Sequence, residues 1–249
     1  MIQAALLALQ FLTRAPVTLS GAPDARTQGI AVLFFPLIGI LIGLTLAGLS
    51  LLLPATTPLL NAALLLAVWV FISGALHLDG LADCADAWIG GHGDRERSLR
   101  ILEDPASGPV AVSVVVCVLL IKFAALSSIA TNAGALLLIP PLTGRALLVA
   151  ALRFTPYVRR HGLGESMARE LPPNAAIVVI AASALLIAWL GSAWTTVAAM
   201  LVYLGVIRAA HRCLGGITGD VAGALCELGE ASALVTLALF SHGQSNVGL

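Results

Sequence analysis

The 249 residues of this chain are 59% hydrophobic and only 10% charged, a balance that excludes an ordinary soluble domain. The mean hydropathy of +1.00 agrees with this, and the formal net charge of zero, without any Lys/Arg-rich tract, argues against nucleic acid as a partner. We therefore predict an all-α, polytopic helical membrane protein whose residues 1–249 form a single integral-membrane domain.

The first apolar segment, residues 1–12, is too short to cross a bilayer as a helix. It lacks a basic n-region and a small-residue cleavage site, so it does not have the pattern of a signal peptide. Proline at position 16 disfavours helix at the residue before it. This pattern predicts a short interfacial or re-entrant helix that ends near Arg14.

Apolar runs long enough to cross a membrane recur along the rest of the chain, each bounded by Pro, Gly or polar residues that end helices. They predict about seven transmembrane helices. The predicted spans are residues 29–53, 58–78, 109–131, 133–152, 174–191, 194–212 and 220–241.

The loops between these spans fall into two sets. The set without charged residues is 54–57, 132–133 and 192–193, and the other set is 13–28, 79–108, 153–173 and 213–219. In the second set, 79–108 is acidic and 153–173 is basic. The loop arginines belong to that set, so the positive-inside rule assigns it to the cytoplasm. Because the acidic residues lie on the same side, we expect one site facing the cytoplasm.

Away from the ends of the predicted spans, four charged residues lie within them: Lys122, Arg145, Glu227 and Glu230. Ionisable side chains are costly in lipid and usually face the bundle interior as functional or ion-paired groups. For the two cations, snorkelling to an interface is the alternative. The two glutamates continue a helix face that begins at Asp220. All four are candidate substrate-binding residues.

Three aspartates lie in the sequence HLDGLADCAD, residues 77–86, as the second predicted span ends. Asp79, Asp83 and Asp86 are spaced at i, i+4 and i+7 and share one helix face. Such carboxylates repel unless a cation lies between them, and hard oxygen ligands suit Mg²⁺. The alternative is a solvated acidic face, although small and apolar residues fill the intervening positions. His77 is a candidate to bind phosphate or orient a carboxylate, and a structural role is equally open.

The charged segment 94–104 is predicted to form a short amphipathic surface helix. Within it, Arg97 is a candidate phosphate partner, while a solvated face with ion pairs explains the other charges equally well. Asp104 lies where the third span begins, so it is a candidate as a fourth metal ligand or as a general base.

Near the C-terminus the glycine-rich sequence GGITGD, residues 215–220, precedes the last predicted helix. Backbone N–H groups at a helix start bind phosphate, so Gly216 and Thr218 are candidate substrate-binding residues. Asp220 suits a metal or a ribose hydroxyl and is a second candidate base. The alternative is an ordinary loop whose acidic residue is favoured by the helix dipole.

Several of these sequences occur together in the order typical of one known family. The most specific are HLDGLAD at 77–83 and GG-x-TGD at 215–220. The others are RAPV at 14–17, FPLIG at 35–39, RER at 95–97 and GLG at 162–164. In this order, over nearly the whole chain, they resemble the cobalamin synthase family, also called adenosylcobinamide-GDP ribazoletransferase.

The resemblance implies a membrane-bound phosphotransferase that joins adenosylcobinamide-GDP to α-ribazole or α-ribazole 5′-phosphate and releases GMP. The product is then adenosylcobalamin or its 5′-phosphate, in the last steps of nucleotide-loop assembly. It also implies Mg²⁺ as cofactor and a lipid environment in the inner membrane of a bacterium. Homo-oligomerisation and contacts with other enzymes of the corrinoid pathway stay open.

Within this resemblance, Asp79, Asp83, Asp86 and Asp104 are the expected metal ligands. Asp83 also belongs to the expected catalytic set, with Asp104 or Asp220 as the base. The family often has an arginine where this chain has Ala106. We therefore expect the phosphate charge to be neutralised by other cations, from the set Arg97, Arg100, Lys122 and Arg145.

Two other functions are weighed against this one. A CDP-alcohol phosphotransferase of lipid synthesis also uses aspartates at the membrane edge, but Asp83 stands where its pattern has an arginine. A cation-coupled transporter would use Lys122, Arg145 and the acidic residues as a translocation path. Transporters often show repeated halves with broken helices at the bilayer midplane, whereas this chain gathers its acidic residues at one membrane face.

Overall fold

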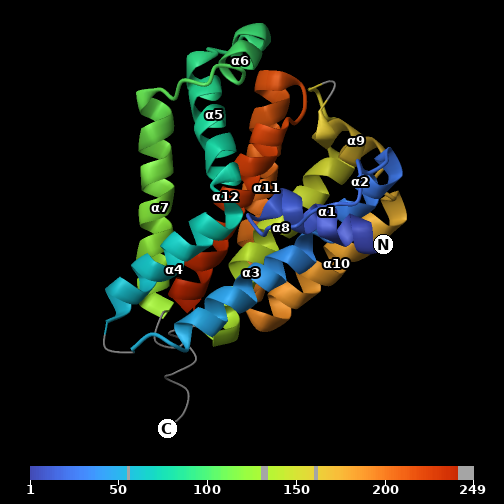
Figure 1. Ribbon diagram of the computed structural model, residues 1–249. Helices are drawn as coiled ribbons and strands as arrows, with labels where there is room; N and C mark the ends of the chain where they lie inside the picture. The colour runs from blue at the N-terminus through green and yellow to red at the C-terminus, as the bar shows by residue number, and fades with distance from the viewer. Residues whose placement is uncertain (55–56, 130–133, 160–161, 241–249) are drawn as a thin grey trace.

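The computed structural model describes residues 1–54, 57–129, 134–159 and 162–240. Within these ranges the regular secondary structure is helical, with one isolated β-bridge between Tyr157 and Ile217. The elements (Figure 1) are α1 (Ile2–Leu12), α2 (Ala25–Val32), α3 (Phe35–Ser50), α4 (Pro58–Ser73), α5 (Leu76–Gly90), α6 (Arg95–Ile101), α7 (Pro109–Ile129), the 3-10 helix η2 (Gly134–Leu138), α8 (Ile139–Phe154), α9 (Leu163–Arg169), α10 (Pro173–Leu190), α11 (Ala193–Leu214) and α12 (Gly219–Phe240). The predicted loop 132–133, part of the loop 54–57 and the span ends at 131, 133 and 241 lie outside the described residues.

Five segments of the described chain are long and apolar enough to cross a membrane: α7, η2 together with α8, α10, α11 and α12. Two further helix pairs reach that length only together, and both are bent, α2 and α3 by 52° and α4 and α5 by 88°. Counting each bent pair as one span gives up to seven, as predicted. The prediction of an all-α, polytopic membrane protein is confirmed.

The second predicted span, 58–78, is not one straight helix. Helix α4 ends at Ser73, and Gly74 is left-handed with φ 64°, a conformation that glycine adopts without strain and that commonly ends helices. Ala75 is left-handed as well, with φ 57°, so α5 begins at Leu76 in a new direction. The three aspartates of the sequence 77–86 therefore lie on a helix of their own.

The first predicted span, 29–53, is also broken, between Val32 and Phe35. Pro36 lies in the first turn of α3, where a missing N–H is tolerated, whereas in a continuous helix it would remove a hydrogen bond. The short N-terminal helix α1 forms as predicted and ends at Leu12.

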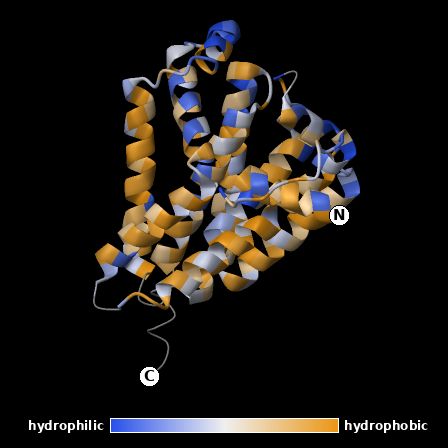
Figure 2. Cartoon of the chain, in the orientation of Figure 1, coloured by the Kyte–Doolittle hydropathy of each residue, from blue (hydrophilic) through white to orange (hydrophobic). Residues whose placement is uncertain are grey.

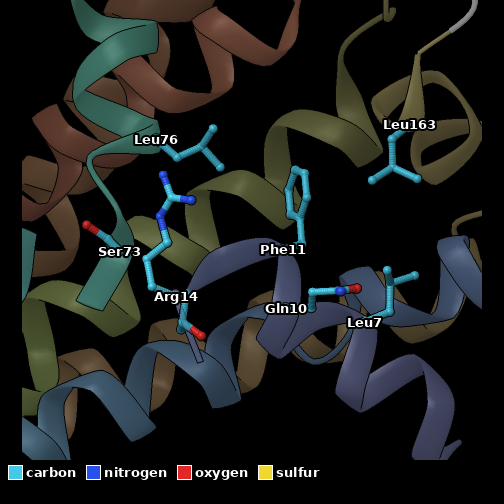
Figure 3. Close-up of a pocket in the computed structure, with 8 residues that line it drawn as sticks. Leu7, Gln10, Phe11, Arg14, Ser73, Leu76 and Leu163 are labelled. Atoms are coloured by element: carbon cyan, nitrogen blue, oxygen red, sulfur yellow. The ribbon is translucent and has the colours of Figure 1, made fainter. Parts of the chain in front are cut away.

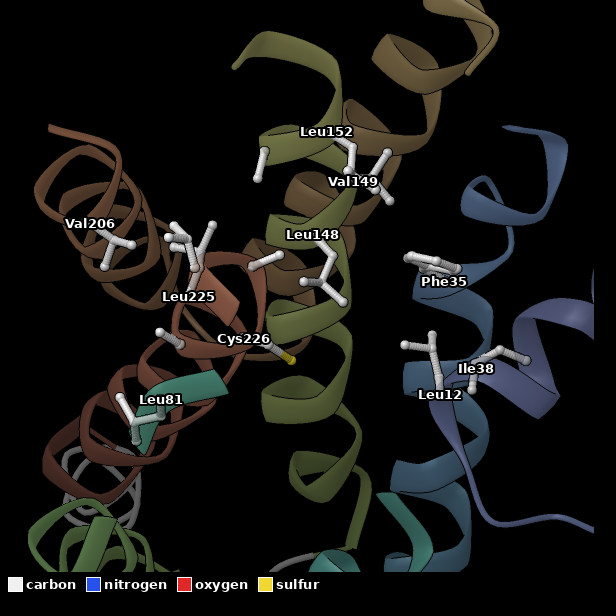
Figure 4. Packing of buried hydrophobic residues seen from close by; sticks show 14 of the residues in the cluster. Leu12, Phe35, Ile38, Leu81, Leu148, Val149, Leu152, Val206, Leu225 and Cys226 are labelled. Carbon is white, nitrogen blue, oxygen red and sulfur yellow. The ribbon is translucent and has the colours of Figure 1, made fainter. Parts of the chain in front are cut away.

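Helices α8 and α12 are the inner helices of the bundle. In the apolar windows of η2 with α8 and of α12, 78% and 67% of the residues are buried, against 17% for α10. Figure 4 shows Leu148 and Leu152 of α8 facing Phe35 of α3, with Leu225 of α12 packed on another face of α8. The core therefore forms where α8 separates α3 from α12.

The outer surface of the bundle is apolar over most helices. Large exposed side chains include Leu44 on α3, Phe71 on α4, Leu120 on α7, Trp189 on α10 and Leu201 on α11. In Figure 2 hydrophilic residues gather on α2, α5, α6 and α9, whereas α3, α4, α7 and α10 are mostly hydrophobic. This distribution is typical of a lipid-facing bundle with one polar region.

Candidate active site

Helices α5 and α12 approach each other closely where the acidic residues lie. A Cβ at Gly80 would stand 2.7 Å from the backbone oxygen of Asp220, closer than real side chains pack. Glycine at position 80 therefore permits the approach, which brings Asp79 and Asp83 of α5 beside Asp220 at the start of α12. We call Asp79, Asp83 and Asp220 the carboxylate site.

Asp83 is half-buried at the centre of this negative charge. The carboxylates of Asp79, Asp220 and Asp86 all lie near enough to repel it, and the cation of Arg159 offsets only part of that repulsion. Neighbouring carboxylates with so little positive charge nearby favour the binding of a cation.

Asp86, the third aspartate of α5, caps helix α7. Its Oδ2 accepts a hydrogen bond from the N–H of Gly108 at 2.5 Å, and its Oδ1 accepts one from Ala111 at 2.9 Å. These bonds satisfy N–H groups that a helix start leaves without partners. In the structure both oxygens of the Asp86 carboxylate are engaged in capping α7. The role of Asp86 as a metal ligand stays a prediction.

Asp104 and Arg97 lie farther out, on the connection that contains α6. Asp104 is exposed, and its Oδ1 accepts a hydrogen bond from the N–H of Ala106 at 3.0 Å. Arg97 is exposed on α6, whose first turn is capped by Asp94. Neither Asp104 nor Arg97 lines the two cavities described below, so their functional roles stay predictions.

A cavity of about 410 Å³ lies between α1, α3, α5, α8, α9 and α12. Its polar lining, from α5, α12 and the segment after α8, includes Asp79, Asp220, Tyr157 and Arg159. Its apolar lining, mostly from other helices, includes Phe11, Phe35, Leu148, Leu152, Leu163 and Met167. The volume is in the usual range for small-molecule sites, which combine an apolar lining with a few polar groups. We call this space the larger cavity.

A second cavity of about 350 Å³ adjoins the first, since Phe11, Leu76 and Leu163 line both. Figure 3 shows the ring of Phe11 and the side chain of Leu163 at this cavity, with the guanidinium of Arg14 reaching toward Leu76. Arg14 also donates a hydrogen bond to the carbonyl of Gly74, at 3.4 Å. The two adjoining cavities thus contain one arginine each, Arg14 in the smaller and Arg159 in the larger.

Asp220 is held by neighbours on two segments. Arg159 donates to its Oδ2 at 3.5 Å, and the Thr218 hydroxyl lies 3.3 Å from the same oxygen. Thr218 also accepts a hydrogen bond from the N–H of Val221 and so caps α12. Gly216 is buried against Pro156, whose backbone oxygen a Cβ would meet. Gly216 and Thr218 therefore fix the loop, and their predicted contact with substrate stays a prediction.

Tyr157 precedes Arg159 and pairs with the same loop through its β-bridge to Ile217. Burial and then the negative charge of Asp220 raise the pKa of the Tyr157 phenol, while Arg159 acts in the opposite direction. Tyr157 therefore keeps its proton at neutral pH and lines the larger cavity as a neutral group.

The four charges predicted inside the spans meet in the bundle interior. Lys122 forms ion pairs with Glu227 and, at 2.6 Å, with Glu230, and Arg145 pairs with Glu230. The Lys122 ammonium also lies 4.8 Å from the centre of the Trp69 ring. We call Lys122, Arg145, Glu227 and Glu230 the buried ion cluster. Each charge has a partner of opposite sign, and the predicted substrate contacts of these four residues stay predictions.

His77 lies at the start of α5 and is only 3% exposed. Among the described residues neither Nδ1 nor Nε2 has a hydrogen-bond partner. Buried polar groups are almost always paired, and His77 lines the larger cavity. Its ring nitrogens are therefore free to bind a ligand there.

The described residues contain no group of three or more His, Cys, Asp or Glu side chains arranged to hold a metal ion. Magnesium does not need such a group, because it is usually bound by one or two carboxylates, with water and substrate phosphate completing its shell. Asp79 and Asp83, at i and i+4 on one face of α5, fit a site of this kind.

Comparison with known families now decides the class of this protein. The model of the family described as cobalamin-5-phosphate synthase matches residues 4–238. The chain belongs to this family. The match runs from α1 to the last turns of α12, so it includes the carboxylate site, the buried ion cluster and both cavities, and it confirms the resemblance found in the sequence.

Curated relatives of the family are similar over their full length. The adenosylcobinamide-GDP ribazoletransferase of Pseudomonas putida (strain GB-1) is 51% identical over 235 residues, which cover 94% of this chain and 98% of the relative. The proteins of the same name from Pseudomonas fluorescens (strain Pf0-1) and Stutzerimonas stutzeri (strain A1501) are each 50% identical over 238 residues, covering 94% of this chain and 98% and 97% of the relatives. No solved structure matches this chain significantly.

Sequence reasoning missed three contributors to the site. Arg159 served only as a marker of topology, and Tyr157 and Phe11 received no role. The sequence GLG at 162–164 lies close to Arg159 and Tyr157 in the chain and could have pointed to them. A Cβ at Gly164 would collide with the Tyr157 ring. Phe11 gave no local signal, since its contact with the Phe35 ring, 5.9 Å between centroids, depends on the fold.

Proposed function

We propose that this chain is an adenosylcobinamide-GDP ribazoletransferase, which joins adenosylcobinamide-GDP to α-ribazole or α-ribazole 5′-phosphate with release of GMP. Family membership over residues 4–238 supports the reaction type. The observation that carries the proposal is the larger cavity, in which Asp79 and Asp220 are combined with an extended apolar lining, with Asp83 within electrostatic reach of both carboxylates.

In this reaction a ribose hydroxyl attacks the phosphorus of the cobinamide phosphate. The new P–O bond forms as the bond from that phosphorus to the bridging oxygen breaks, and GMP leaves with the oxygen. An acceptor that carries a 5′-phosphate has no free 5′-hydroxyl, so the attacking group is a hydroxyl on the ribose ring. The chain has to take up one proton and to hold the two substrates in line.

We propose that Asp220 accepts the proton of the attacking hydroxyl. A general base needs first to be within reach of the hydroxyl, and Asp220 lines the larger cavity with its carboxylate fixed by Arg159 and Thr218. Asp104, the other candidate, is exposed on the α6 connection. Asp220 is therefore the better placed of the two.

We propose Mg²⁺ as the cofactor, with Asp79 and Asp83 as its protein ligands. Bound there, it would neutralise charge on the diphosphate and on the departing GMP. The chain contributes the spacing of the two carboxylates on α5 and, through the contact at Gly80, their closeness to Asp220. Arg159 and Arg14, one in each cavity, are the cations available to the phosphate oxygens of the donor.

We also propose that the protein lies in the inner membrane of a bacterium with this site toward the cytoplasm. The support is the positive-inside rule, since the charged segments that it assigns to the cytoplasm, 79–108 and 153–173, contain Asp79, Asp83 and Arg159. An oligomer, or contact with other enzymes of the same pathway, stays a prediction.

The test is a transfer assay with the full-length chain in nanodiscs, supplied with labelled adenosylcobinamide-GDP and α-ribazole. We expect equal amounts of GMP and corrinoid product, loss of both with EDTA, and recovery when Mg²⁺ is restored. CDP-diacylglycerol with an alcohol acceptor serves as the competing substrate pair. Turnover of the lipid pair alone, or cation uptake by proteoliposomes without any transfer, would contradict the proposal.

A further inference from the structure

The two substrates of the proposed reaction carry very different bases. The guanine of the donor has two N–H donor groups and several acceptor atoms on its edges. The base of α-ribazole is a benzimidazole, an apolar bicyclic ring with one free acceptor nitrogen and no donor. Since unpaired polar atoms are costly to bury, a pocket distinguishes the two bases by the number of polar partners that it offers.

The apolar lining of the larger cavity offers an aromatic surface with few hydrogen-bonding side chains. Phe11 is partly exposed, and Phe35, Met167, Leu148 and Leu152 line the cavity from largely buried positions. The rings of Phe11 and Phe35 stack with an interplanar angle of 17°. This apolar part of the lining offers few partners to the edge of guanine, but it matches a flat apolar base.

His77 is the polar group in this part of the cavity with unused bonding capacity. Both of its ring nitrogens are buried without a hydrogen-bond partner in the part of the chain that the structure describes. Its backbone is fixed against α12, because a Cβ at Gly223 would lie 3.2 Å from the Cα and the carbonyl oxygen of His77. A neutral imidazole has one N–H to donate, and the benzimidazole has one nitrogen to accept it.

Resting on the proposed function, we propose that the apolar part of the larger cavity binds the benzimidazole base of the acceptor nucleoside. His77 donates a hydrogen bond to its free ring nitrogen, and the ribose lies toward Asp220, which lines the same cavity. His77 is then a specificity-determining residue for the acceptor, while the guanosine of the donor lies elsewhere.

The direct test compares α-ribazole with the matching indole riboside, in which a C–H replaces the free ring nitrogen. For the unmodified chain we expect kcat/KM to be about tenfold lower with the indole riboside, the usual effect of one lost hydrogen bond. In His77→Phe the two acceptors should be used equally well, and His77→Gln, which retains an N–H donor, should recover part of the preference. The KM for adenosylcobinamide-GDP should change by less than about twofold.

The matched control is His211→Phe, the same substitution at an exposed histidine on α11. This variant should keep the full preference for α-ribazole. Equal use of both acceptors by the unmodified chain, or a preference that persists in His77→Phe, would overturn the role of His77.

A second variant tests the location of the base without changing His77. Leu163 is 39% exposed where the two cavities adjoin, so Leu163→Trp adds bulk there without opening a hole in the core. We expect the KM for α-ribazole to rise about tenfold with little change for the donor. Leu185→Trp, at a 72% exposed position on α10, is the control. A rise confined to the KM of the donor would place the guanosine in this cavity and overturn the inference.

Calorimetric binding of α-ribazole to the full-length chain separates this inference from the proposed function. A chain that binds α-ribazole through His77 but does not turn over adenosylcobinamide-GDP would support the base site and contradict the transferase. A chain that carries out the transfer without any effect of substitutions at His77 or Leu163 would support the transferase and contradict the base site.

Discussion

The carboxylate site and the buried ion cluster place acidic side chains in opposite conditions. In the buried ion cluster two carboxylates pair with two cations, and all four side chains are at most 6% exposed. In the carboxylate site three acidic groups share the cation of Arg159, which is 42% exposed at its side chain. The charges of the first group balance within the protein, whereas the second group has negative charge left for a ligand.

Both groups use the same helix. Asp220 lies in the first turn of α12, and Glu227 and Glu230 lie two to three turns further along. The buried pairs fix α12 against α7 and α8, and the contact at Gly80 fixes it against α5. Charge pairing in the interior therefore holds the helix whose first turn supplies Asp220 to the carboxylate site.

The largest expected effect is on turnover, from Asp83→Asn. Removing the central negative charge should lower kcat at least about 1000-fold, because the amide is a poor ligand for Mg²⁺. Stability should hold or increase, since the substitution relieves repulsion. Steady-state kinetics and thermal unfolding in nanodiscs measure the two effects.

Glu103→Gln is the control for this substitution, because Glu103 is an exposed acid on the α6 connection. It should leave kcat unchanged. Near-normal turnover in Asp83→Asn would remove Asp83 from the metal-binding residues.

The next largest effect is on stability, from Lys122→Met in the buried ion cluster. Leaving two carboxylates short of a cation should lower the free energy of unfolding by about 3–5 kcal/mol. Adding Glu227→Gln should recover part of this loss, because fewer unpaired charges remain. Unfolding in mixed detergent, followed by tryptophan fluorescence, measures the cycle. Strictly additive losses would mean that the two side chains do not interact.

A smaller effect is expected from Asp86→Asn. This variant tests whether Asp86 only caps α7 or also binds the metal. The amide keeps one acceptor oxygen for α7 but not two, so we expect a loss of about 1 kcal/mol in stability and only a modest change in kcat. A loss of turnover as large as that of Asp83→Asn, at unchanged stability, would instead assign Asp86 to the metal.

The smallest effect on stability is expected from Arg159→Gln. The partly exposed ion pair to Asp220 contributes less than about 1 kcal/mol. The kcat/KM for transfer should still fall about tenfold, because a charge beside the carboxylate site is lost. Arg169→Gln, at an exposed arginine on α9, provides the comparison and should change neither quantity. Unaltered kinetics in Arg159→Gln would exclude this arginine from the site.

The membrane architecture could be predicted because it depends on local properties of the sequence. The length and polarity of each apolar run identify a span, and the spacing of Asp79, Asp83 and Asp86 places them on one helix face. The bend after α4 could not be predicted, because a single glycine inside an apolar run is also compatible with a continuous helix.

The pairing of charges was beyond local reasoning for a physical reason. Arg145 and Glu230 are 85 residues apart in sequence, Lys122 and Glu227 are 105 apart, and Arg159 and Asp220 are 61 apart. Their partners are decided by how α7, α8 and α12 pack. The sequence identified the four charges of the buried ion cluster as unusual for a membrane span, but not which of them neutralise each other.

The hydrogen bonds that the N–H groups of Gly108 and Ala111 donate to Asp86 also join the two ends of the connection between α5 and α7. Because residues 22 positions apart are joined there, the segment that contains α6 forms a loop whose two ends lie close together. Within this segment Ser98 is buried and its hydroxyl donates a hydrogen bond to the carbonyl of Ala87, so α6 also packs on α5. Replacing residues 92–104 by a short glycine-serine bridge should therefore lower the stability as well as remove the exposed arginines of α6, while the hydrogen bonds to Asp86 still join α5 to α7.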